Sequence, residues 1–192
     1  MHTQYATIAI LCSLLSGSAI AGTTILLKFD ELQGSGTPWS GENYSQYGVV
    51  FSTSLGAELR AYGNGTGTYG NNFIYGSTSG SANAQVRAVF DNGVNNVGFS
   101  VIDSAPPDQT WTIQIFDINS ELLDTLEGTG GSADGKDPYI EFARDSFDIY
   151  EVVFSPSSDF EGIDNFRYTV VPAPGTACVF LSFAALARRR RC

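Results

Sequence analysis

Few residue types that support catalysis occur in the central part of this 192-residue chain. The only histidine is His2, and the three cysteines are Cys12, Cys178 and Cys192, so residues 22–171 contain neither type. This excludes Ser-His-Asp and Cys-His catalysis, zinc sites made of His or Cys, and internal disulfides for residues 22–171. Two carboxylates suffice for glycoside hydrolysis, but no acidic pair here lies in a motif typical of an acid beside a nucleophile. We therefore expect no enzyme activity, with a glycosidase as the minor alternative.

Aromatic side chains are the second group that could do chemistry, because a saccharide site needs an exposed ring for stacking and a few polar groups for the hydroxyls. Trp39 and Tyr44 lie in the polar segment TPWSGENYSQYG, and Tyr69 and Tyr75 lie in the glycine-rich residues 63–83. These four aromatics are the predicted ligand-binding residues. For Trp39, packing over a sheet edge is an equally good interpretation. Residues 63–83 are interpreted either as a mobile hairpin insertion or as an adaptable polar surface.

The charge of the chain is distributed very unevenly. All 20 acidic residues lie between Asp30 and Asp164, whereas four of the ten basic residues are the terminal Arg188, Arg189, Arg190 and Arg191; the six others leave residues 22–171 with a formal charge of −14. So acidic a surface repels phosphate backbones and attracts cations. Nucleic acid is therefore not an expected partner.

The elements that position these groups are predicted to be short strands. Val97, Phe99 and Val101 alternate with polar residues, as do Trp111, Ile113 and Ile115, and such a period of two is typical of half-buried strands. Asn92-Gly93 indicates a tight turn. The predicted strands cover residues 25–29, 48–53, 59–62, 85–90, 96–102, 110–117, 139–142, 149–155 and 163–171. Their number and spacing predict an all-β fold for residues 22–171: a single antiparallel β-sandwich, most simply a jelly roll.

The N-terminal residues 1–21 have the pattern of a signal peptide. An apolar run over residues 7–20 ends in Ala19-Ile20-Ala21, with small residues where signal peptidase prefers them, so cleavage is expected before Gly22. The alternative is a buried N-terminal helix, but no amphipathic pattern marks a packing face.

The C-terminal residues 172–192 have a different pattern. Pro172, Ala173, Pro174 and Gly175 precede an apolar segment, residues 176–187, which the four arginines follow. As a helix this segment would span ~18 Å of a hydrocarbon core of ~30 Å, and the arginines would hold its end on the cytoplasmic side. A glycolipid-anchor signal and a core helix are weaker alternatives.

This order of a Pro-x-Pro tripeptide, a short apolar helix and a terminal arginine cluster resembles the PEP-CTERM sorting signal of exported bacterial proteins. The resemblance implies transient anchoring in the inner membrane, processing by an exosortase-type enzyme, and a final place in the cell envelope, at the surface or in the extracellular matrix. Ala173 stands where that family has its central glutamate.

The central residues resemble the jelly-roll domains often found ahead of this signal, through FDEL, YGVVFS, GFSV, IQIFDINSELL and EGIDNFRYTVVPAPG. These domains are similar in turn to galactose-binding and carbohydrate-binding-module sandwiches. The resemblance implies a structural calcium ion held by Asp30 and Glu31 near the first strand and by Asp164 and Asn165 near the last. The alternative is that these are solvated residues at strand ends. Taken together, the sequence predicts a structural protein of the envelope or matrix, with a carbohydrate-binding module for extracellular polysaccharide as the alternative.

Overall fold

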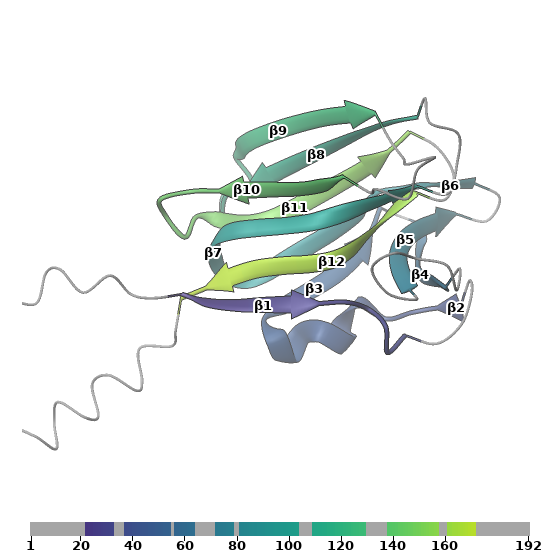
Figure 1. Ribbon diagram of the computed structural model, residues 1–192, viewed down its shortest axis with the longest axis horizontal. Helices are drawn as coiled ribbons and strands as arrows, with labels where there is room; N and C mark the ends of the chain where they lie inside the picture. Colours follow the sequence, from purple (N-terminus) through teal and green to yellow (C-terminus); the bar gives the residue numbers. More distant parts are fainter. Residues whose placement is uncertain are drawn as a thin grey trace, which may run out of the picture. The chain divides into compact units, whose positions relative to one another are not determined.

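The fold is organised around one long strand that belongs to both layers of a β-sandwich. The computed structural model describes residues 22–32, 37–54, 56–63, 72–78, 81–103, 109–129, 138–157 and 161–171. Within them, the first part of β7 (Val86–Asp103) pairs with β3 (Val49–Thr53) and β11 (Ile149–Pro156), and its second part pairs with β10 (Tyr139–Ala143) and β12 (Glu161–Val170). Because β7 changes partners along its length, the two layers are parts of one continuous sheet (Figure 1).

The other strands extend these two layers, and each pairing is antiparallel. One layer continues from β11 through β8 (Thr110–Phe116) to β9 (Leu122–Thr129). In the other, β12 pairs with β1 (Thr23–Leu27) and β5 (Asn72–Thr78), and β5 pairs with β4 (Glu58–Gly63) and β6 (Ser81–Ala84). The two-residue β2 (Thr37–Pro38) pairs with β4, and a 3-10 helix, η1 (Gly41–Tyr47), leads into β3. The predicted all-β antiparallel sandwich is confirmed.

The core between the layers is rich in aromatic side chains. The Phe166 ring of β12 stacks on Phe99 of β7 at a centroid distance of 5.7 Å and meets the edge of Phe51 of β3 at 5.1 Å. The predicted alternation is confirmed in β8, where Trp111, Ile113 and Ile115 are buried and the residues between them are partly exposed. In β7, Val97, Phe99 and Val101 belong to the core, but Ser100 between them is buried as well. Each inward row packs against the facing layer, and this removal of apolar surface from water stabilises the sandwich.

The chain reverses its direction at Asn92-Gly93 (Figure 1), as the sequence predicted, although both residues are assigned to β7. The part of β7 before this point pairs with β3 in one layer, and the part after it pairs with β12 in the other. Gly93 also allows a close contact. A β-carbon at this position would lie 2.9 Å from the carbonyl carbon of Phe147, so the glycine permits a close backbone approach.

The described part of residues 63–83 contains a hairpin, as one interpretation expected, but this hairpin belongs to the sheet instead of being inserted into it or forming an adaptable surface. Residues 72–78 form β5, which joins β4 to β12, and residues 81–84 form β6. Ile74 of β5 packs in the main core, whereas Phe73 and Tyr75 are buried on the other side of the strand. The segment is thus a structural part of the sheet.

The predicted signal peptide, residues 1–21, and the predicted sorting tail, residues 172–192, lie outside the described residues. Thr23–Val171 form one compact unit. Within the described part of the chain, we find no helix with the length and apolar character needed to span a membrane.

Candidate functional site

Two of the aromatics predicted to bind a ligand are core residues. Tyr44 is only 3% exposed, and its ring packs edge-on against Phe29 at 5.4 Å. Tyr75 is buried beside Phe73 and Tyr62. Neither ring has a free face for a sugar, so the expectation of exposed platforms is wrong for both.

Trp39 and Tyr69 have different outcomes. Trp39 is partly buried and packs against the core beside Phe29 and Tyr44, which agrees with the packing interpretation. Tyr69 lies outside the described residues. The exposed aromatic of the segment around Trp39 is instead Tyr47, at the end of η1, which is 45% exposed.

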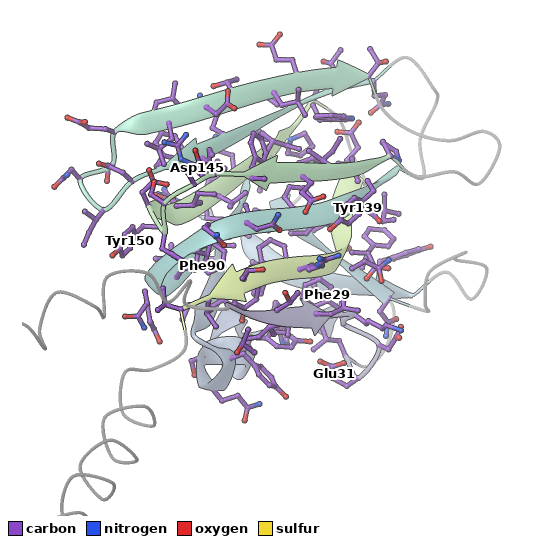
Figure 2. All side chains as sticks on the ribbon, turned by 60° about the vertical axis from the view of Figure 1, so that its left-hand side comes forward. Phe29, Glu31, Phe90, Tyr139, Asp145 and Tyr150 are labelled. Carbon is purple, nitrogen blue, oxygen red and sulfur yellow. The ribbon has the colours of Figure 1, made fainter. Side chains whose placement is uncertain are left out.

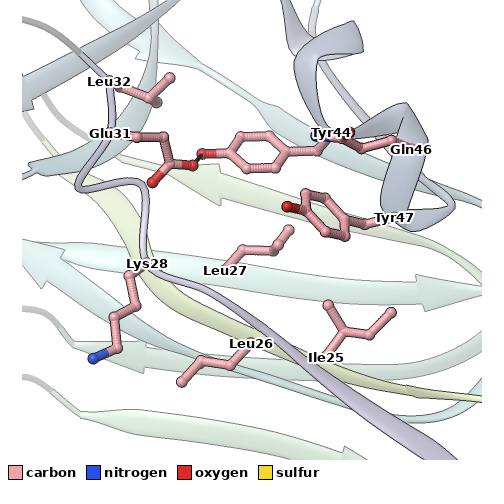
Figure 3. Close-up of a pocket in the computed structure, with 9 residues that line it drawn as sticks. All are labelled: Ile25, Leu26, Leu27, Lys28, Glu31, Leu32, Tyr44, Gln46 and Tyr47. Atoms are coloured by element: carbon pink, nitrogen blue, oxygen red, sulfur yellow. Dashed lines mark hydrogen bonds between the residues drawn. The ribbon is translucent and has the colours of Figure 1, made fainter.

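Tyr47 lines a hollow of about 490 Å³ between β1 and η1, which we call the edge hollow. Figure 3 shows Leu26, Leu27 and Lys28 along β1 and the turn after it, with Tyr44, Gln46 and Tyr47 on the opposite side. The Glu31 carboxylate accepts a hydrogen bond from the Tyr44 phenol. The hollow thus combines an exposed ring with an ammonium, a carboxylate and an amide.

The orientation of η1 is fixed from two sides. Its last carbonyl, that of Tyr47, accepts a hydrogen bond of 2.7 Å from the buried Tyr168 phenol. After it, Gly48 adopts a left-handed conformation with φ of 80° and donates back to the Ser45 carbonyl at 2.9 Å, a helix ending that glycine favours. Tyr47 is therefore presented by a well-anchored element.

The four predicted calcium ligands lie in different environments. Asp30 and Glu31 are exposed in the turn after β1, whereas Asp164 of β12 is buried and accepts a 2.6 Å hydrogen bond from the backbone N–H of Asn165. The Asn72 side-chain amide donates to three carbonyls of that turn, the closest being Leu32 at 2.6 Å. In the described ranges, no three acidic, His or Cys side chains gather closely enough to hold a metal ion. The calcium site stays a prediction.

The structure reveals a second hollow, of about 350 Å³, on the outer surface of the layer made by β10, β7, β12 and β1. We call it the face hollow. It is lined by Leu26, Ser100, Tyr139, Asn165 and Arg167. Tyr139, labelled in Figure 2, is 46% exposed.

The Tyr139 ring leans across β7 because residue 98 is a glycine. A β-carbon at Gly98 would lie 2.9 Å from the Tyr139 Cζ atom and would collide with the phenol oxygen. The absence of a side chain on Gly98 thus leaves room for a ring that covers the sheet on one side and is open to solvent on the other. Such a ring can act as a stacking platform.

Charged and amide groups surround this ring. Partial burial and the Glu141 carboxylate raise the pKa of the Tyr139 phenol, while Arg167 acts in the opposite direction, so both charges lie near the ring. Glu141 accepts a hydrogen bond of 2.6 Å from the Asn96 amide. Arg167 is exposed between the buried Phe166 and Tyr168. These groups are suited to hydrogen-bonding sugar hydroxyls beside the ring.

Comparisons with known proteins define the fold class. No family model matches the sequence, and no curated protein matches it. The K2 cleaved adhesin domain of Lys-gingipain superposes with a TM-score of 0.53 at 11% identity, covering 77% of this chain and 100% of that one. The K1 cleaved adhesin domain from Porphyromonas gingivalis W83 gives 0.50 at 12% identity, with coverages of 79% and 100%. The chain has the fold of these β-sandwich domains.

A weaker likeness, with a TM-score of 0.45 and 10% identity, relates 78% of this chain to 28% of the CBM22-1 and GH10 modules of endo-1,4-beta-D-xylanase 10B from Clostridium thermocellum, a structure complexed with xylohexaose.

Proposed function

We propose that this chain is an exported protein of the bacterial envelope or extracellular matrix whose β-sandwich binds a polysaccharide without catalysis. The observation that carries the proposal is the half-exposed Tyr139 ring lying over Gly98, with Glu141 and Arg167 beside it. An aromatic face flanked by a hydrogen-bond acceptor and a donor has the groups that sugar recognition needs.

Two further observations support the surface role. The pattern of residues 1–21 and 172–192 is that of an exported, tail-sorted chain. Two structures with this fold are described as adhesin domains. In this proposal the tail is recognised by an exosortase-type enzyme through Pro172, Ala173 and Pro174.

The proposal is tested by retention of the purified protein on immobilised polysaccharides of several linkage types. Tyr139→Ala is expected to weaken retention by about tenfold, because aromatic stacking contributes up to about 1.5 kcal/mol. Ile118→Ala is the matched control, since Ile118 is 68% exposed in the turn between β8 and β9 and lines neither hollow. Absence of retention on every polysaccharide would leave a structural role without a glycan ligand.

A further inference from the structure

We infer that a single linear, uncharged polysaccharide chain occupies the face hollow and the edge hollow together, crossing β1 over Leu26. This inference rests on the proposed function and specifies its ligand as a polymer segment several sugars long. The alternative within the same function is a short glycan held in the face hollow alone.

The first argument is that the two hollows adjoin. Leu26 lines both of them and is 50% exposed, so it forms a low apolar ridge between them. β1 has β12 as its pairing partner, and among the described strands none pairs with its other side. A ligand that leaves the face of the sheet at Arg167 therefore meets Leu26 next, and beyond it the edge hollow.

The second argument is that each hollow holds one half-exposed tyrosine, Tyr139 in the face hollow and Tyr47 in the edge hollow. Both rings are carried by anchored backbone, Tyr139 by the pairing of β10 with β7 and Tyr47 by the bond from Tyr168. Platforms fixed before binding reduce the ordering cost of the complex. Two such platforms on either side of an apolar ridge suit successive sugar rings of one chain.

The third argument concerns charge. Each hollow has a positively and a negatively charged side chain in its lining or next to it. Lys28 and Glu31 line the edge hollow, and Arg167 and Glu141 flank Tyr139 of the face hollow. Residues 22–171 carry a formal charge of −14, which repels a polyanion. An uncharged chain avoids this repulsion and still offers hydroxyls to all four charged groups.

The test compares chain lengths, using the purified full-length protein. The probes are mixed-linkage β-glucan, linear xylan, galactomannan and pullulan, with polygalacturonate as the acidic comparison. Disaccharides and hexasaccharides are then prepared from each polymer that is retained, and their affinity and stoichiometry are measured by calorimetry. We expect one hexasaccharide per protein, bound at least tenfold more tightly than the disaccharide, and no retention on polygalacturonate.

Substitutions separate the hollows from the ridge. Tyr47→Ala and Tyr139→Ala should each lower the affinity for the hexasaccharide by about tenfold. Leu26→Lys should weaken binding of the hexasaccharide more than binding of the disaccharide. Thr24→Lys is its control, because Thr24 is an exposed residue of the same strand that lines neither hollow. Thermal unfolding of each variant establishes that it is folded.

The outcomes distinguish the inference from the function on which it rests. Equal affinity for disaccharide and hexasaccharide, indifference to Tyr47→Ala, or equal effects of Leu26→Lys and Thr24→Lys would overturn the two-hollow chain while leaving polysaccharide binding intact. Retention on polygalacturonate alone would overturn the inference that the ligand is uncharged. No retention of the unmodified protein on any probe would overturn the proposed function and this inference with it.

Discussion

The phenol of Tyr44 donates a hydrogen bond to the carboxylate of Glu31, which joins η1 to the turn that follows β1. Burial is the main cause of the raised pKa of the Tyr44 phenol, and the bond to Glu31 raises it further. The sequence alone suggested separate roles for these residues, a stacking platform and a calcium ligand. The structure makes them partners at the border of the edge hollow.

This bond should contribute measurably to stability. Tyr44→Phe keeps the ring and its packing against Phe29 but removes the donor, so the free energy of unfolding should fall by about 1 kcal/mol. Glu31→Ala, which removes the acceptor, should have a similar effect. A double-mutant cycle measured by chemical denaturation tests this. Strictly additive losses would show that the bond contributes nothing.

Stability should fall at high pH because of buried tyrosines. Burial raises the pKa of the Tyr168 phenol well above its ordinary value of 10.0. Above pH 10 the Tyr168 phenol loses its proton in the unfolded chain but keeps it in the folded protein. Unfolding therefore releases a proton, and the free energy of unfolding decreases as pH rises. Below pH 10 this contribution is fully present.

Tyr168→Phe isolates that effect. The variant lacks the ionisable group. Above pH 10 its free energy of unfolding should therefore fall less steeply than that of the unmodified protein, by about 1.4 kcal/mol per pH unit. At neutral pH it should be about 1 kcal/mol less stable, because the bond to the Tyr47 carbonyl is lost. Parallel declines for the two proteins in denaturant titrations would contradict the prediction.

Gly98 should be as important for ligand binding as Tyr139 itself. In Gly98→Ala the new methyl group meets the phenol and lies 2.8 Å from the Ile140 carbonyl oxygen. We expect a loss of about 1–3 kcal/mol in stability and weaker retention on polysaccharide, because the ring must move off β7. If Gly98→Ala binds the polysaccharide like the unmodified protein, the position of the ring over β7 is unimportant.

The predicted calcium site has a direct test in thermal unfolding. An ion held by Asp30, Glu31, Asp164 and Asn165 would raise the unfolding temperature, and a chelator would reverse the change; saturation at a hundredfold over Kd corresponds to about 2.7 kcal/mol. Asp164→Asn should abolish the response. An unfolding temperature that changes with neither calcium nor chelator would refute the predicted calcium site.

The sorting prediction is tested by intact mass. Protein recovered from cells before processing should contain Arg188 to Arg191, and the secreted or surface-bound protein should lack them. It should also begin at Gly22. Retention of the arginines in both pools would exclude processing of the tail.

Local patterns predicted those strands whose apolar residues alternate, and they failed where pairing is decided far away in the chain. Residues 96–102 and 110–117 alternate clearly and were placed correctly. Residues 72–78 are interrupted by glycine and polar residues, and they become a strand because β4 and β12 pair with them. Asn92-Gly93 has the composition of a turn, and the chain reverses there as it passes from one layer to the other (Figure 1).

The face hollow could not be found from the sequence for a similar reason. Tyr139 and Glu141 share a strand face by spacing alone, yet nothing local shows that this face is the outer one or that Gly98 lies beside them. A glycine within a strand pattern is the one available signal, because it often marks a close approach. It does not identify the aromatic residue that makes use of the space.

The position of β12 determines when this domain becomes able to fold. β12 is the last strand in the chain, yet it pairs with β1, β5 and β7 and contributes Phe166 and Tyr168 to the core. During synthesis, β1 therefore cannot pair with β12 until residues some 140 positions later have been made. The β-sandwich is incomplete while the chain emerges from the ribosome. An export channel that accepts only unfolded chains would therefore receive the domain before it has folded. The domain would fold only after β12 has crossed the membrane.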